Sequence, residues 1–125
     1  MAVPSPLLPG RPPVSGYGRG SFRLGSIEHK GSLLILPGGV YAWPAGDAGH
    51  LSVEDLSPVL DAGAAINFLI LGTGPAQIFP SRALREHFAA AHIGLEAMDT
   101  GAACRTHNVL LAEERIFASA LIAIP

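Results

Sequence analysis

The second half of the chain alternates between apolar runs and helix-like segments, and this alternation constrains the fold more than any other feature. Residues 66–71 form a compact apolar run typical of a buried strand, and Gly-Thr-Gly at 72–74 ends it. Ser81 is placed to cap a helix that Gly94 stops, and residues 95–98 predict a second strand. Buried strands joined through helices are typical of an α/β protein.

A further helix and strand complete the alternation. Asp99 or Thr100 is placed to cap a helix that runs to about Leu111, and residues 116–124 predict the last strand. Strand–helix–strand connections within one sheet are right-handed crossovers that join parallel strands. The C-terminal half therefore predicts βαβ units with a parallel part of a sheet.

The first half has short strands that lie too close together in sequence for crossovers. Residues 22–24 and 27–29 alternate between apolar and polar, and residues 33–36 and 40–43 are short apolar runs, with glycine-containing turns between them. These segments predict antiparallel N-terminal strands. Combined with the parallel half, they make the expected β-sheet mixed.

A short helix between the halves has two possible starts. Ser52 and Asp55 have the spacing of a capping box, but Pro58 falls inside the helix that this box would begin. Ser57 as N-cap with Pro58 at the first helical position is the cleaner start. We expect one loose turn and then a helix over residues 58–62.

The domain boundary follows from the prolines. Of the 11 prolines in this 125-residue chain, five fall within the first thirteen residues. Such a stretch forms few regular hydrogen bonds, so we expect residues 1–15 to be a disordered or extended tail and residues 16–125 to be a single α/β domain.

Composition and charge restrict the function classes. The chain is 49% hydrophobic and 14% charged, which favours strands covered on both faces, a buried oligomer surface, or both. A net charge of −2 supplies no basic field, so a nucleic-acid partner is not expected. The sequence has no secretion signal pattern and no apolar run near the ~20 residues of a membrane span. We expect a cytoplasmic protein with no membrane span.

The residues that bear reactive or metal-binding side chains form no complete site. Cys104 is the only cysteine, which excludes an internal disulfide and a Cys-x-x-Cys zinc site. Cys104 and His107 are helical neighbours, but a nucleophile also needs an orienting group and an oxyanion hole. A half-buried cysteine beside an apolar stripe is favoured instead. That stripe is expected to comprise Ala102, Ala103, Thr106, Val109 and Leu110. The other histidines are interpreted as solvated surface residues: His29, His50, His87 and His92.

The loop after residue 71 and the polar side of the last helix supply the remaining candidates. Thr73 lies in a loop at a strand end, where α/β proteins bind ligands, but Gln77 replaces the third glycine of a dinucleotide fingerprint, so a plain turn is favoured. Arg105 and Asn108 fall on the polar side of the helix. Arg105 is suited either to read a carboxylate or to pair with Glu113 or Glu114, and we favour the structural pair.

These residues also resemble a known family. The series consists of Met98-Asp99-Thr100, Ala103-Cys104-Arg105-Thr106-His107-Asn108-Val109-Leu110, Glu113-Glu114-Arg115 and Ala120-Leu121-Ile122, with Gly72-Thr73-Gly74 and Gly31-Ser32 upstream. It resembles a family of small domains of unknown function that includes the mitochondrial respiratory complex I assembly factor 3 and an adipogenesis-associated animal protein. The resemblance spans roughly Tyr17 to the C-terminus and implies a three-layer α/β fold with a central mixed sheet. One departure is His107, where the family pattern has an aromatic residue such as tyrosine.

Two hypotheses of function follow. The first is a non-catalytic interaction or assembly module that binds a protein partner or a second copy, with a possible link to a respiratory or other membrane complex. It needs no cofactor, no metal and no catalytic residue. The alternative is a small-molecule-binding protein or weak enzyme with a strand-end cleft near Thr73, Asp99, Arg105 and Asn108.

Overall fold

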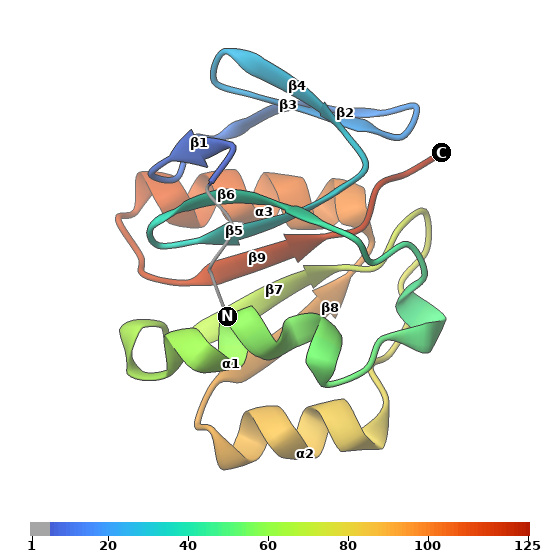
Figure 1. Ribbon diagram of the computed structural model, residues 1–125, viewed down its shortest axis with the longest axis vertical. Coiled ribbons are helices and arrows are strands. Elements are labelled where there is room, and N and C mark those ends of the chain that lie inside the picture. Colours follow the sequence, from blue (N-terminus) through green and yellow to red (C-terminus); the bar gives the residue numbers. More distant parts are fainter. Residues whose placement is uncertain (1–5) are drawn as a thin grey trace.

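The computed structural model describes residues 6–125 and has a six-stranded mixed sheet at its centre (Figure 1). The strands of this sheet are β1 (Leu8–Pro9), β5 (Ser32–Leu36), β6 (Gly39–Trp43), β7 (Phe68–Gly72), β8 (Gly94–Met98) and β9 (Ala118–Leu121). They are arranged in the order β1-β6-β5-β9-β7-β8. Pairing is antiparallel from β1 to β9 and parallel among β9, β7 and β8. The expected α/β class and mixed sheet are confirmed.

A second, three-stranded antiparallel sheet and three helices cover the central sheet. The small sheet consists of β2 (Val14–Gly18), β3 (Ser21–Leu24) and β4 (Ile27–Lys30). It lies with α3 (Thr100–Ala112) over one face, while α1 (Ser57–Ala62) and α2 (Arg82–Ala90) lie over the other (Figure 1). This arrangement is the expected three-layer domain.

Alternation along the central strands produces two cores. In β7, Leu69 and Leu71 pack toward α1 and α2, whereas Ile70 packs toward α3 and the small sheet. All three side chains are at most 1% exposed. Because successive side chains of a strand point to opposite faces, a strand covered on both sides reads as a continuous apolar run, and this explains residues 66–71.

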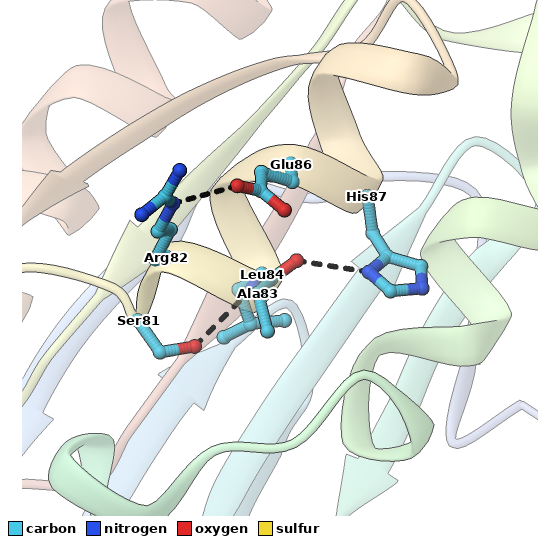
Figure 2. Close-up of polar contacts among 6 residues, drawn as sticks. All are labelled: Ser81, Arg82, Ala83, Leu84, Glu86 and His87. Carbon is cyan, nitrogen blue, oxygen red and sulfur yellow. Dashed lines mark hydrogen bonds and ion pairs between the residues drawn. The ribbon is translucent and has the colours of Figure 1, made fainter.

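The second helix begins at its expected cap. Figure 2 shows the Ser81 hydroxyl accepting a hydrogen bond from the Leu84 backbone N–H at 3.2 Å. His87 lies on the exposed side of α2, 2.9 Å through Nδ1 from the Ala83 carbonyl oxygen (Figure 2). The helix ends before Gly94, because the C-cap at Ala91 is followed by His92 in the left-handed region with φ 58°.

Gly94 begins strand β8 instead of ending the helix. A Cβ at this position would lie 3.1 Å from Cβ of Phe68, the residue that pairs with it on β7. This close approach accounts for a glycine at the start of the strand.

The residues of the two expected helix starts lie at two successive elements, a 3-10 turn and helix α1. The Ser52 backbone N–H donates to an Asp55 carboxylate oxygen at 2.8 Å, which closes the turn η2 (Glu54–Leu56). Pro58 lies in the first turn of the following helix. The expected N-cap is wrong, however: Leu56 occupies that position, and no side chain caps the helix.

The N-terminal segment differs from the expected tail over residues 1–15. Residues 1–5 lie outside the described part of the chain. Leu8 pairs with Val40, and Pro9 pairs with Gly39 at the edge of the central sheet. An edge position suits proline because its missing N–H leaves no central partner unsatisfied. Val14 is 5% exposed and begins β2, so the folded domain begins before residue 15.

None of the helices within residues 6–125 is long and apolar enough to cross a bilayer.

Candidate functional site

Thr73 closes the loop at the carboxyl end of β7. Its hydroxyl lies 2.6 Å from the Ala76 carbonyl oxygen and accepts from the Ile78 backbone N–H at 3.1 Å. Gln77 adds a hydrogen bond from its side-chain amide to the Ala97 carbonyl oxygen at 2.9 Å. The polar groups of this loop therefore bind the protein's own main chain.

The same loop displays an aromatic side chain that was not among the predicted site residues. Phe79 is 81% exposed, and its neighbour Ile78 is 38% exposed. Because Thr73 and Gln77 hold the preceding residues, Phe79 projects from a fixed base. An aromatic residue immediately before Pro80, in a loop of small and polar residues, was the available signal.

Asp99 and Thr100 join the ends of three elements. Asp99 caps α3 by accepting a hydrogen bond from the Ala102 backbone N–H at 2.9 Å. The buried Thr100 hydroxyl accepts from the Gly74 backbone N–H at 2.8 Å and donates to the Ile122 carbonyl oxygen at 2.7 Å. Thr100 therefore ties the loop after β7 to α3 and to the segment after β9, a role that the sequence did not reveal.

Arg105 bonds to the small sheet. Its guanidinium donates to the Tyr17 hydroxyl at 3.3 Å. The expected ion pair with Glu113 or Glu114 is wrong, since Arg115 is the cation nearest Glu113, at 4.0 Å. The Tyr17 hydroxyl also lies against Gly101, where an added Cβ would come within 2.7 Å of it.

Asn108 fixes the first residue of β2. Its amide oxygen accepts from the Val14 backbone N–H, and its amide nitrogen donates to the Val14 carbonyl oxygen, both at 2.8 Å. The side chain thus pairs with Val14 as a neighbouring strand would. This contact joins positions 94 residues apart in sequence.

His107 is a buried polar residue of α3. Its Nδ1 lies 2.8 Å from the Ser119 hydroxyl, and its Nε2 lies 3.4 Å from the Pro12 carbonyl oxygen. Because a carbonyl oxygen only accepts, Nε2 carries the proton and Nδ1 accepts from Ser119. Burial lowers the pKa of His107 to about 4, with a smaller contribution from Arg11, while the bond to Pro12 opposes the shift.

Cys104 is buried beside this histidine on the same face of α3. Burial raises the pKa of its thiol to about 12, against a smaller opposing effect of Arg105. The thiolate form is therefore scarce near neutral pH, and a thiol in that state is a poor nucleophile.

The buried face of α3 differs from the expected apolar stripe by a rotation about the helix axis. Val109 is 58% exposed, whereas Cys104 and His107 are at most 2% exposed and lie on the buried face with Thr100 and Ala103. The hydroxyl of Thr100 and the imidazole of His107 have hydrogen-bond partners, which removes most of the cost of burying them.

The four candidate side chains do not converge on a ligand. Thr73 and Asp99 lie at the N-terminal end of α3, whereas Arg105 and Asn108 lie farther along the helix and bond to β2. A surface hollow of about 370 Å³ lies over β2 and β3, and these four residues are not among those that line it. Within residues 6–125, no three histidine, cysteine or acidic side chains lie close enough to hold a metal ion.

The geometry defines a three-layer α/β domain whose polar side chains mainly bind its own main chain. Residues 14–122 match the family described as protein of unknown function (DUF498/DUF598), and the chain belongs to that family. This confirms the family expected from the C-terminal half.

The relatives include bacterial and animal proteins. An uncharacterized protein of Rhodobacter capsulatus is 31% identical over 125 residues, which cover 100% of this chain and 95% of that protein. NADH dehydrogenase [ubiquinone] 1 alpha subcomplex assembly factor 3 of Danio rerio is 31% identical over 112 residues, or 90% of this chain. The chain spans 64% of the length of that assembly factor.

The fold also matches a solved structure. The crystal structure of a protein of Bartonella henselae, described as an outer membrane protein, aligns with a TM-score of 0.90 at 38% identity. The alignment covers 94% of this chain and 99% of that one. The likeness confirms the fold over nearly all of both chains.

Proposed function

We propose that this protein is a non-catalytic protein-binding module that helps to assemble a respiratory or other membrane complex. The observation that supports it most directly is Phe79, 81% exposed on a loop fixed by hydrogen bonds. An aromatic side chain that is exposed on a fixed loop loses little conformational entropy when it enters a partner's pocket. It also buries a large apolar area there. Aromatic residues of this kind are enriched among the side chains that dominate binding energy.

The relatives supply the assembly part of the proposal. The Danio rerio relative is named as an assembly factor and shares 31% identity over 90% of this chain. A shared fold alone does not transfer function, so the assembly role rests on this likeness and on the exposed loop together. The proposed place of action is the cytoplasm, which fractionation of host cells tests.

The alternative of a strand-end ligand cleft has less support. Thr73, Asp99 and Asn108 each bond to main-chain groups, and Arg105 bonds to Tyr17. Cys104 has a raised pKa and is 2% exposed, so it lacks both the charge state and the access of a nucleophile.

The test compares two exposed apolar positions in the native host. Deleting the gene should lower the amount of an assembled membrane complex on native gels, and the wild-type gene should restore it. Phe79→Ala should fail to restore it, whereas Val109→Ala, a matched truncation of a 58% exposed residue on α3, should succeed. Normal amounts of every membrane complex after deletion would overturn the assembly role. Full restoration by Phe79→Ala would show that Phe79 is not part of the binding surface.

A further inference from the structure

We propose that the hollow over β2 and β3 binds an acidic, extended segment of the protein partner, an inference that rests on the proposed function. The hollow has a volume of about 370 Å³ and is open to solvent. It is lined by residues of the small sheet, among them Gly16, Gly18, Arg19, Ser21, Arg23 and Glu28.

Two glycines create the hollow. Gly16 pairs with Arg23 and Gly18 pairs with Ser21, while the intervening pair includes the buried Phe22. Since strand side chains alternate between faces, Gly16 and Gly18 lie on the outer face with Arg23 and contribute no side chain there. The floor is therefore main chain, which an extended polypeptide can approach closely.

The rim carries two arginines and one glutamate. Arg23 pairs with Glu28 at 2.9 Å, and both side chains are more than half exposed. Arg19 forms no ion pair with any residue from 6 to 125. Its guanidinium is therefore available to a carboxylate, for which its planar donor pattern is well suited.

Arg19 occupies a backbone conformation that its residue type disfavours. Its φ is 52°, and Gly20 follows with φ 76°, as in a hairpin turn that ordinarily takes asparagine, aspartate or glycine. The turn is anchored, because the Gly20 backbone N–H donates to the Ile124 carbonyl oxygen and its own carbonyl accepts from Gly31. A disfavoured conformation held by surrounding contacts is a feature of functional positions.

Charge is unevenly distributed along residues 6–81, and the segment that forms the small sheet is basic. Residues 6–30 contain four Arg or Lys and one Glu, whereas residues 31–81 contain four acidic residues and no Arg or Lys. The first group includes the small sheet, and the second includes α1 on the opposite face of the central sheet (Figure 1). The hollow thus lies in a basic segment of a protein with net charge −2, and basic residues attract acidic segments.

Binding of a defined peptide tests the proposal. A fluorescein-labelled peptide of alternating glutamate and glycine should bind the full chain, and the matching lysine–glycine peptide should not. Arg19→Asn should weaken binding by about fivefold, near the upper end for loss of one exposed ion pair, while suiting the turn. Gly16→Ala should weaken binding, because the added methyl group would occupy the floor of the hollow. The variant should fold normally, because its Cβ would contact only Cβ of Arg23, at an ordinary 3.7 Å. Arg82→Asn on α2 is the matched control and should bind as wild type does.

The other outcomes separate failure of this proposal from failure of the proposed function. Equal binding of both peptides, or wild-type affinity in Arg19→Asn, would show that the hollow does not select acidic segments. Binding of free citrate without binding of the peptide would assign the site to a small carboxylate, and binding of phosphatidylserine vesicles alone would assign it to a membrane. If the acidic peptide fails while complex assembly still requires the gene and Phe79, only the hollow is excluded. If the peptide binds but gene deletion changes no complex, the assembly role fails instead.

Discussion

Asn108 on α3 satisfies both main-chain hydrogen-bonding groups of Val14, each at 2.8 Å, and so acts as a strand partner for the first residue of the small sheet. The bonds are partly buried and link the start of the domain to its last helix. Asn108 is therefore best explained as a residue that holds the small sheet in place.

Replacing Asn108 tests this role. Asn108→Ala should lower the free energy of unfolding by about 1–3 kcal/mol, because two partly buried main-chain groups lose their partner. Asn108→Asp should also destabilise, since it retains an acceptor for the Val14 N–H but places a carboxylate oxygen against the Val14 carbonyl. Urea unfolding measures both variants, and wild-type stability in Asn108→Ala would contradict the role.

Truncation of the N-terminus tests the revised domain boundary. Removing residues 1–13 deletes β1 and the contact between Pro12 and His107, so the melting temperature should fall by several degrees. Removing only residues 1–5 leaves β1 and the contact between Pro12 and His107 in place and serves as the control. An unchanged melting temperature in the longer deletion would restore the boundary at residue 15.

The buried imidazole of His107 makes stability depend on pH. Its pKa is 6.5 in the unfolded chain and about 4 in the fold, so the unfolded state takes up the proton first. The contribution is complete above pH 6.5 and is lost as pH falls toward 4, by about 2 kcal/mol at pH 5. His107→Phe should be less stable at pH 7, because Ser119 loses its partner, yet should change less between pH 7 and pH 5. Urea unfolding at pH 7 and at pH 5 measures both proteins. An equal change in the free energy of unfolding between the two pH values would contradict this prediction.

Cys104 should resist modification in the folded protein. With a pKa of about 12 and 2% exposure, its thiol should react with iodoacetamide at pH 8 far more slowly than after unfolding in urea. Mass spectrometry of timed samples measures both rates. Rapid labelling of the native protein would indicate an accessible thiolate and would revive a chemical role for this residue.

The elements that the sequence predicted are those encoded by neighbouring residues. The strand at 66–71 and the Ser81 cap depend on local apolar periodicity and on hydrogen bonds within one turn, so both appear in the structure. The mixed sheet follows from the spacing of the strands, because short connections pair antiparallel strands and longer ones with helices permit parallel pairing.

The features that the sequence missed depend on distant partners. Helix α3 buries His107 and exposes Val109 because Ser119 and Pro12 provide hydrogen bonds that no helical projection contains. The pairing of Asn108 with Val14 likewise joins opposite ends of the chain. The proline content predicted a disordered or extended tail. The pairing of β1 with β6 depends on residues 39–43, so the first fifteen residues alone do not reveal it.

The position of β9 has a consequence for how this protein is made. It lies between antiparallel β5 and parallel β7, and no other strand formed by residues 6–125 joins the two halves of the central sheet. A ribosome synthesises residues 118–121 after the other strands of the central sheet, so until they emerge β5 and β7 lack the strand that pairs with both, and their apolar side chains remain exposed. Pairing of β9 with β5 also joins residues more than 80 positions apart, which slows folding. We therefore expect the domain to fold as one unit after this strand is translated, and to need protection from aggregation until then.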